Sequence, residues 1–233
     1  MPKQGIVLEI KENALFIADA HYPHHGKEFL TFLQEIQTKK IKTTQLFLMG
    51  DIFDLLFGHN KYIQTFLKEA ITLLQELSQS LEILYLEGNH DFCLKEIFPY
   101  IKIYKREQQP IHYQLNNKNV YLSHGDKYAT GFCYNFYSKI LRNKITLTLL
   151  KPFEKQIIDH KIKKLKIKKI CGDFEGYQKR FDTIINHYPK DALIIEGHFH
   201  QGLVHENYIS LPSLACHQKI AVVEKGEIVF KKL

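Results

Sequence analysis

The chain has 233 residues, of which 45% are hydrophobic and 24% charged, and its net charge is +7. This composition is ordinary for a globular protein, and the absence of any apolar run near the roughly 18 residues that span a bilayer excludes a transmembrane protein. The positive charge suggests an anionic partner, such as a phosphate ester, a nucleic acid or a membrane surface, although a basic protein without such a partner explains it nearly as well.

The four cysteines show no paired spacing, which argues against a zinc knuckle or a disulfide framework. We therefore expect Cys93, Cys133, Cys171 and Cys216 to be core thiols in a reducing compartment. The N-terminus lacks a charged segment followed by an apolar one, as a secretion signal would have. A cytoplasmic protein, or one peripheral to the inner membrane, is expected.

The first half of the chain alternates between strand and helix patterns. Residues 5–10 and 14–18 flank a polar turn and predict a hairpin, and residues 26–40 carry apolar side chains at helical spacing. A strand pattern at residues 45–49 and a long helical pattern at residues 61–81 follow, and then another strand begins at residue 82. This order is typical of a layered α/β fold with parallel strands at its centre.

The second half begins with strand patterns and then changes character. Residues 101–115 and 120–123 predict strands joined by a turn at Asn116 and Asn117. Between residues 127 and 190 the chain is rich in aromatic residues and includes a basic segment at residues 160–169, and Asp173 could cap a last helix. We predict a helical insertion or cap at 127–190 within a core formed by 1–126 and 191–233. Closing strands are expected near residues 208–211, 220–223 and 228–230.

Five strand patterns end in side chains that can bind metals or transfer protons. The central one, at residues 45–58, reaches a glycine turn and then Asp51. Parallel strands place ligands at their carboxyl ends, so these ends are expected to converge. A lone histidine at such a position is usually structural, but packed cores avoid so many unpaired carboxylates and imidazoles. The other strand ends carry Asp19 and His21; Asn89, His90 and Asp91; His124 and Asp126; and His198 and His200.

Carboxylate, imidazole and amide oxygen donors together suit Mn²⁺, Fe or Zn²⁺. A carboxylate shared between two such ions would allow a metal pair that activates water and grips phosphoryl oxygens. The sequence therefore predicts hydrolysis of a phosphate ester or anhydride.

These blocks resemble, in order, the five motifs of the calcineurin-like metallophosphoesterases: Asp19-Ala20-His21, Gly50-Asp51, Gly88-Asn89-His90-Asp91, His124-Gly125-Asp126 and Gly197-His198-Phe199-His200. The resemblance implies a four-layer α/β/β/α sandwich and two divalent ions, with Mn²⁺ expected first. One ion would be held by Asp19, His21, Asp51 and His200, and the other by Asp51, Asn89, His124 and His198. The resemblance further implies that His90 and Asp91 form a catalytic pair, and we expect Asp91 to accept a ring N–H of His90.

Within that family the chain looks most like the UDP-2,3-diacylglucosamine diphosphatases of lipid A synthesis, which release UMP and 2,3-diacylglucosamine 1-phosphate. That branch has Arg at the position of His90 and acidic residues at those of Gly131 and Phe132. The resemblance implies a nucleotide diphospho-lipid substrate, and the apolar and basic insertion suits an anionic membrane surface. The residues expected to contact the substrate are Asn89, His90, Lys166, Lys168 and His198.

Two alternatives remain open at this point. The same metals could serve a phosphoesterase that acts on a soluble phosphodiester, a phosphomonoester or a nucleic acid. A non-catalytic interaction module could also keep the fold, but degraded ligand positions would then be expected, and every ligand position is intact. We predict no protein partner and no specific nucleic acid.

Overall fold

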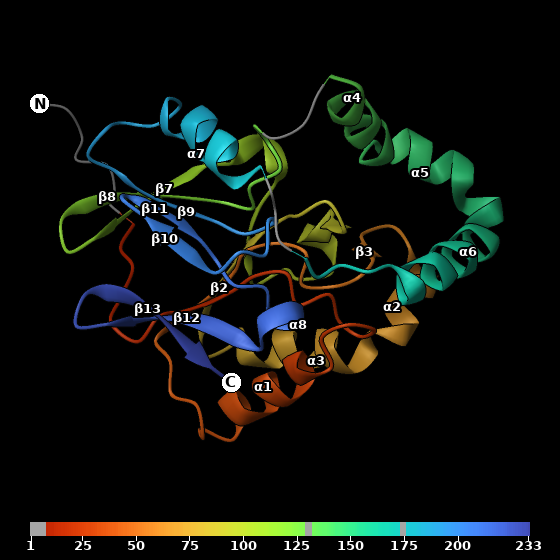
Figure 1. Ribbon diagram of the computed structural model, residues 1–233. Helices are drawn as coiled ribbons and strands as arrows, with labels where there is room; N and C mark the ends of the chain where they lie inside the picture. Colours follow the sequence, from red (N-terminus) through yellow and green to blue (C-terminus); the bar gives the residue numbers. More distant parts are fainter. Residues whose placement is uncertain (1–7, 129–131, 173–175) are drawn as a thin grey trace, which may run out of the picture.

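The computed structural model describes residues 8–128, 132–172 and 176–233, and two β-sheets pack face to face at its centre (Figure 1). The first sheet runs in the order β13-β12-β1-β2-β4-β6. Its strands β1, β2, β4 and β6 are parallel, as the alternating patterns predict, while β12 and β13 are antiparallel to their neighbours. The bounds are β1 (Leu15–Ile17), β2 (Gln45–Leu48), β4 (Glu82–Leu86), β6 (Lys102–Tyr104), β12 (Lys219–Glu224) and β13 (Glu227–Lys232).

The second sheet runs in the order β10-β11-β9-β8-β7. Strands β7 and β8 form the predicted hairpin, and Asn116 and Asn117 make its turn with positive φ angles of 49° and 63°. Strands β8, β9 and β11 are parallel. The bounds are β7 (Ile111–Leu115), β8 (Lys118–Ser123), β9 (Leu193–Glu196), β10 (Leu203–His205) and β11 (Tyr208–Ser210), and a separate pair joins β3 (Leu56–Phe57) to β5 (Asp91–Phe92).

Helices cover the outer faces of both sheets, which confirms the predicted four-layer sandwich. Helices α1 (Glu28–Gln37) and α3 (Lys68–Leu77) bury their apolar faces against the first sheet. Helix α7 (Tyr177–Ile185) packs on the second sheet through Phe181 and Ile184, which join Ile194 and Tyr208 in one cluster. A further apolar layer fills the space between the sheets, where Phe16 stacks on Phe47 at 4.5 Å between ring centroids.

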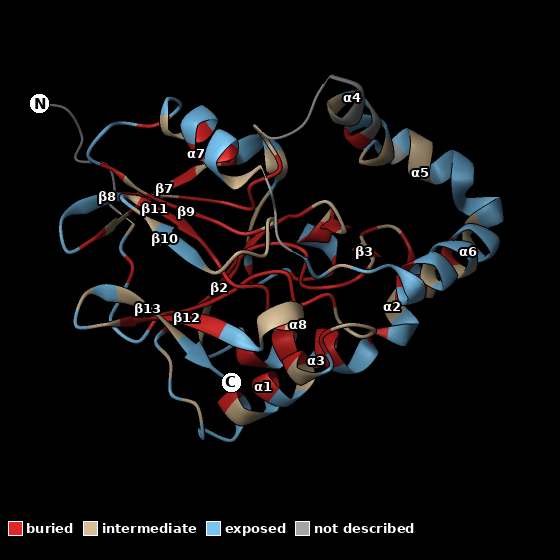
Figure 2. Cartoon of the chain, in the orientation of Figure 1, coloured by how far each residue is buried: buried red, intermediate tan, exposed pale blue. Residues whose placement is uncertain are grey.

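The stretch predicted as one insertion divides into two parts. Helices α4 (Phe132–Leu141), α5 (Lys144–Leu150) and α6 (Glu154–Ile167), with the 3₁₀ turn η3 (Lys151–Phe153), extend away from the sheets and are largely exposed (Figures 1 and 2). Helix α7 instead belongs to the sandwich. Asp173, the predicted cap of this last helix, lies outside the described residues, as do residues 129–131, which include Gly131.

The cap made by α4–α6 rests on the short helix α2 (Lys61–Phe66). The hydroxyl of Tyr62 donates to Asp159 at 2.9 Å, and the Tyr62 amide donates to Glu154 at 3.1 Å. The predicted helix at residues 61–81 is thus two helices, because Leu67 adopts a non-helical backbone with φ −112° and ψ 9°. This break turns α2 toward α6 while α3 stays on the sheet.

Two local expectations are corrected. The described part of the first predicted hairpin pairs elsewhere: Ile10 donates to the Gln114 carbonyl at 2.8 Å, and β1 pairs with β2 and β12. Cys171 and Cys216 form a disulfide across 45 residues rather than remaining thiols, because the return from the cap brings them to a Cα–Cα distance of 5.5 Å. The 3₁₀ turns η1 (Leu94–Glu96) and η2 (Arg106–Gln108), strand β10 and helix α8 (Leu214–His217) had no distinct sequence signal.

Among the described residues, each helix is too short or too polar to cross a membrane.

Candidate metal centre

The predicted ligands all follow strands at one edge of the two sheets. Asp19 and His21 follow β1, Asp51 follows β2, and Asn89 and His90 follow β4. The second sheet contributes His124 after β8, and His198 and His200 after β9. The carboxyl ends of parallel strands from both sheets meet there, as the sequence predicts.

Two groups of donor atoms form around Asp51. In the first, Asp19, His21 and His200 each place a carboxylate oxygen or ring nitrogen within 4.8 Å of the others. In the second, Asp51, His124 and His198 do the same, and the Asn89 side-chain oxygen lies 3.4 Å from Nε2 of His124. Asp51 also groups with His21 and His90 at this distance, so it stands between the two groups.

The backbone at these residues is unusual. Asp19, His21, Asp51, His198 and His200 all have positive φ angles, between 47° and 64°. Side chains other than glycine rarely adopt this region, and such conformations persist where the surrounding structure imposes them, as at functional sites. The strain thus falls on five of the seven predicted ligands.

Gly88 shows how closely the loops approach one another. A Cβ atom at Gly88 would lie 2.2 Å from Oδ1 of Asp51, inside any allowed contact. That oxygen accepts a hydrogen bond from the His90 amide at 2.8 Å, and Oδ2 of Asp19 accepts one from the His198 amide at 2.8 Å. The Asp51 and Asp19 carboxylates are therefore each fixed by the backbone of another site loop.

Three histidines are oriented in the same way. Nδ1 of His124 donates to the Met49 carbonyl at 2.9 Å, Nδ1 of His90 to the Asp54 carbonyl at 2.7 Å, and Nδ1 of His200 to the Ile170 carbonyl at 3.1 Å. Each bond places the proton on Nδ1 and leaves Nε2 for the site. Carbonyl partners of this kind fix the tautomer of metal-binding histidines.

Burial and neighbouring charges set the protonation of the cluster. Burial lowers the pKa of His21 and of His198 to about 4, which favours the neutral imidazole that binds metals. Burial also disfavours charge on His124, but the Asp51 and Asp19 carboxylates outweigh it and raise the pKa of His124 to about 9. Burial would raise the pKa of Asp51, but His124 and the other nearby histidines hold it well below its usual range.

The residues fit two divalent cations. Nδ1 of His21 is buried without a hydrogen-bond partner in the part of the chain that the structure describes. Two carboxylates, an amide oxygen and four imidazoles form the donor set, and Asp51 can serve both ions.

Asp91 lies apart from this chemistry, and its expected hydrogen bond with the His90 ring is wrong. The Asp91 carboxylate is fully buried and faces inward, because five donors of the surrounding loops converge on it. These donors are the amides of Asp51 (3.0 Å), Ile52 (2.6 Å), Phe53 (3.3 Å) and Gly88 (2.9 Å) and the hydroxyl of Tyr85 (2.6 Å). Asp126 also turns away from the cluster, toward Arg106 at 2.6 Å.

A buried acid that the sequence did not single out lies beside the cluster. Asp54 is 2% exposed, and its carboxylate contacts Nδ1 of His24 at 2.8 Å and Nδ1 of His25 at 2.9 Å. It also lies 3.7 Å from Nδ1 of His21. Its position three residues after Asp51 was the available signal, but only the fold shows which histidines it orients.

A groove of about 450 Å³ runs beside Asp54, between α2 and α6. Its walls are mainly apolar, and Lys163 and Lys166 line it. Lys166, one of the two lysines expected to contact the substrate, lines this groove, while the other, Lys168, follows the end of α6 and does not line it. The apolar lining includes Leu55, Ile63, Phe66, Leu67 and Ile162.

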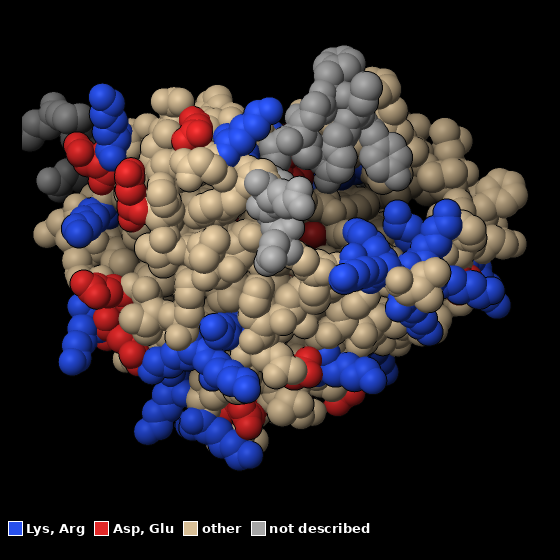
Figure 3. Space-filling view, in the orientation of Figure 1, with Lys and Arg blue, Asp and Glu red and all other residues tan. Residues whose placement is uncertain are grey.

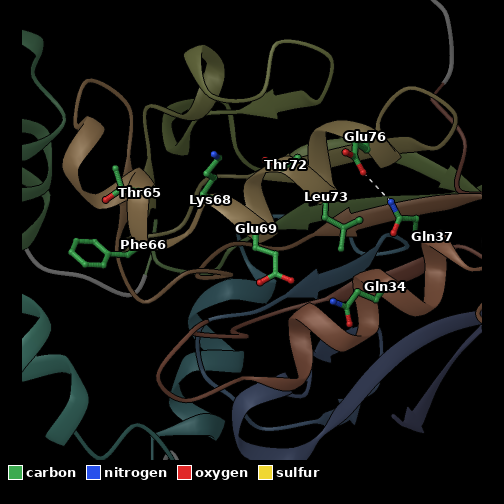
Figure 4. A pocket seen from close by; sticks show the side chains of 9 residues that line it. All are labelled: Gln34, Gln37, Thr65, Phe66, Lys68, Glu69, Thr72, Leu73 and Glu76. Atoms are coloured by element: carbon green, nitrogen blue, oxygen red, sulfur yellow. Dashed lines mark hydrogen bonds between the residues drawn. The ribbon is translucent and has the colours of Figure 1, made fainter.

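A second depression, of about 550 Å³, lies between α1, α2 and α3 (Figure 4). Most of the residues that line it are polar or charged, and one of them, Gln37, donates a hydrogen bond to Glu76 at 2.9 Å. It belongs to the outer helical layer and brings no predicted site residue together.

Comparison with known sequences shows one family. The family model described as calcineurin-like phosphoesterase matches residues 13–202. A UDP-2,3-diacylglucosamine hydrolase of Coxiella burnetii is 25% identical over 213 residues, which cover 83% of each chain. A protein of the same description from Hamiltonella defensa is 26% identical over 226 residues, which cover 90% of this chain and 85% of the relative. Among solved structures, a phosphoesterase from E. coli aligns over 93% of this chain and 96% of its own, with 12% identity and a TM-score of 0.45.

Proposed function

Because the chain belongs to the calcineurin-like phosphoesterase family, we propose that this metal-dependent phosphoesterase hydrolyses the diphosphate of UDP-2,3-diacylglucosamine. Water would be consumed, and UMP and 2,3-diacylglucosamine 1-phosphate would be released. The curated relatives named for this substrate, which match most of the chain at about a quarter identity, support the proposal.

The proposed cofactors are two Mn²⁺ ions. One would be held by Asp19, His21, Asp51 and His200, and the other by Asp51, Asn89, His124 and His198. When bound, two divalent cations supply Lewis acidity that activates water and neutralises charge on phosphoryl oxygens.

The residues around the cations would position the substrate. The Asp54 carbonyl holds the proton of His90 on Nδ1, which orients the ring toward Asp51 and His21. From there His90 can contact a phosphoryl oxygen or the leaving oxygen. Asp91 would act indirectly, as a positioning residue that ties the loops of Asp51 and His90 together.

The observation that carries the lipid assignment is the groove between α2 and α6. It joins apolar walls to the lysines Lys163 and Lys166 and opens beside Asp54, next to the cluster. An acyl chain suits the apolar walls, and phosphate oxygens suit the lysines. A small soluble phosphodiester has phosphate oxygens for the lysines but no acyl chain for the apolar walls.

The test is to supply UDP-2,3-diacylglucosamine in detergent with Mn²⁺ and to measure UMP and the lipid phosphate. Ile162→Glu places a charge in the groove and should lower turnover of the lipid by at least roughly tenfold, while bis-(4-nitrophenyl) phosphate is still hydrolysed at the parent rate. Gln156→Glu is the matched control, because it adds the same charge at an exposed polar position of the same helix, outside the groove. Turnover of soluble esters without any release of UMP would overturn the lipid substrate and favour a soluble phosphoester or nucleic acid.

Membrane docking by the cap is part of the proposal. Lysines gather over the region of α6 (Figure 3), and exposed apolar side chains accompany them on the cap helices. Lysine charges at anionic headgroups with apolar side chains beside them suit an enzyme that takes its substrate from a bilayer. The exposed apolar residues include Phe136, Ile145, Leu149, Phe153 and Ile167.

A further inference from the structure

The segment that returns from the cap to the core is attached at three points. After α6 ends, the Lys168 carbonyl accepts a hydrogen bond from Nε2 of His25 at 3.1 Å, and the Ile170 carbonyl accepts one from Nδ1 of His200 at 3.1 Å. The next residue, Cys171, forms a disulfide with Cys216 of α8. In Figure 1 this segment runs from the end of α6 back toward α8. We call residues 168–171 the return segment.

The other end of the disulfide is also tied to the metal centre. Helix α8 is capped at its N-terminus by Ser213, whose hydroxyl donates to the Asp19 carbonyl at 2.8 Å. The Ala215 amide donates to the same carbonyl at 3.3 Å, and Sγ of Cys216 lies 3.7 Å from Nδ1 of His200. The disulfide therefore joins the segment that orients His200 to the helix that supports Asp19.

His200 and Asp19 face each other in one donor group, with Nε2 of His200 at 3.2 Å from Oδ1 of Asp19. The Ile170 carbonyl holds the tautomer that keeps the lone pair of His200 on Nε2. If the return segment moved away, the His200 ring could rotate or exchange its proton. Loss of an orienting partner of this kind typically weakens metal binding by roughly 10–100-fold.

We propose that the Cys171–Cys216 disulfide is a redox-sensitive latch, which holds the return segment against His200 and so strengthens metal binding by the Asp19–His21–His200 group. The latch rests on the metal centre of the proposed function but not on the lipid substrate. Its opening would leave the group around His124 and His198 intact, since no described contact of the return segment reaches those two side chains.

Opening the latch needs a thiol reductant, and a dithiol supplies complete chemistry. A thiolate of the dithiol attacks Sγ of Cys171, which is exposed, whereas Cys216 is half-buried. The Cys171–Cys216 bond breaks, and Cys216 leaves as a thiolate that takes up a proton. The second thiol of the reductant then displaces Cys171, so the chain gains two thiols and the dithiol becomes a cyclic disulfide. A small-molecule disulfide would close the latch by the reverse exchange.

The experiment uses the full chain loaded with Mn²⁺, and its readouts are the dissociation constants of the ions from titration and free Mn²⁺ from its electron paramagnetic resonance signal. The oxidised parent should bind two ions. Treatment with dithiothreitol should weaken one of them by roughly 10–100-fold and leave the other unchanged. The double variant Cys171→Ser/Cys216→Ser should reproduce that weakening without reductant.

Two controls separate the latch from other effects. Dithiothreitol should change nothing further in the double variant, which excludes chelation by the reductant. Cys93→Ser should behave as the oxidised parent, because Cys93 is not in the disulfide.

The outcomes distinguish the latch from the proposed function. The latch alone would be overturned if the oxidised, reduced and double-serine proteins all bound two ions equally well. Four free thiols in the protein purified under oxidising conditions would also overturn it. Binding of two ions with redox dependence but no UMP release would overturn the substrate alone. An oxidised parent that binds no Mn²⁺ would overturn both.

Discussion

Replacing Asp91 with asparagine tests whether this carboxylate holds the site loops together or moves a proton. One oxygen accepts two backbone amides, and the other accepts two amides and the Tyr85 hydroxyl. All five partners approach as donors to a side chain with 0% exposure. An amide side chain offers one acceptor in place of two.

The loss of stability in Asp91→Asn can be obtained by counting the hydrogen-bond donors that lose their acceptor. Whichever way the asparagine is turned, its NH₂ group faces at least two backbone N–H groups. A hydrogen bond to a charged group contributes about 1.5–3 kcal/mol, so Asp91→Asn should lower the free energy of unfolding by about 3–6 kcal/mol. In a chain of this size the melting temperature should fall by on the order of 10 °C.

The assay is urea and thermal unfolding of the metal-free protein, followed by circular dichroism. Tyr85→Phe removes one of the five donors and keeps the buried ring, so it should cost about 1–3 kcal/mol. The exposed Asp191→Asn is the matched control and should change nothing. The structural role is refuted if the free energy of unfolding of Asp91→Asn lies within about 1 kcal/mol of the parent's while kcat collapses. That result would favour a part for Asp91 in proton transfer.

Four further predictions concern the site, the cap and the pH dependence of stability. His90→Asn should lower kcat by roughly 10²–10⁴-fold with metal content intact, and less for a nitrophenyl ester, whose leaving group needs no proton; normal turnover would remove His90 from catalysis. Asp19→Ala should empty one metal site and His124→Ala the other by elemental analysis, whereas equal loss from both would mean that the ligands are wrongly divided. Changing the lysines of residues 161–169 to Gln should weaken binding to anionic vesicles by on the order of 1 kcal/mol per charge, and added salt should shrink the effect; a parent that never binds vesicles would contradict membrane docking. Burial raises the pKa of Glu87 from 4.5 to about 7, so its contribution to stability is full below pH 4.5 and is lost as the pH rises through 7. Relative to Glu87→Gln, the parent should therefore lose on the order of 3 kcal/mol between pH 4.5 and pH 8 in urea unfolding, and parallel pH curves for the two proteins would contradict this.

The ligand positions could be read from the sequence because each depends on local pattern. A short apolar run, a turn and a polar side chain identify a strand end, and parallel strands bring such ends to one edge whatever the details of packing. Asp19, Asp51 and His124 therefore lie together in the structure as expected. The layered α/β class followed from the same alternation of strands and helices.

Contacts between distant segments could not be predicted from the sequence, because a local pattern does not encode which loops come into contact. The hydrogen bonds of Asp91 depend on loops that are close only after both sheets have formed, and so does the orientation of His24 by Asp54. The break at Leu67 likewise reflects packing, since the helical pattern continues through it.

The disulfide shows the same limit. Cys171 and Cys216 are separated by 45 residues and carry no motif, so nothing in their spacing pairs them. They meet because the return from the cap must pass His200 to reach the second sheet. Sequence determined which side chains could bind metal, whereas tertiary structure decided which backbone groups, acids and cysteines hold those side chains in place, since these partners become neighbours only when the chain is folded.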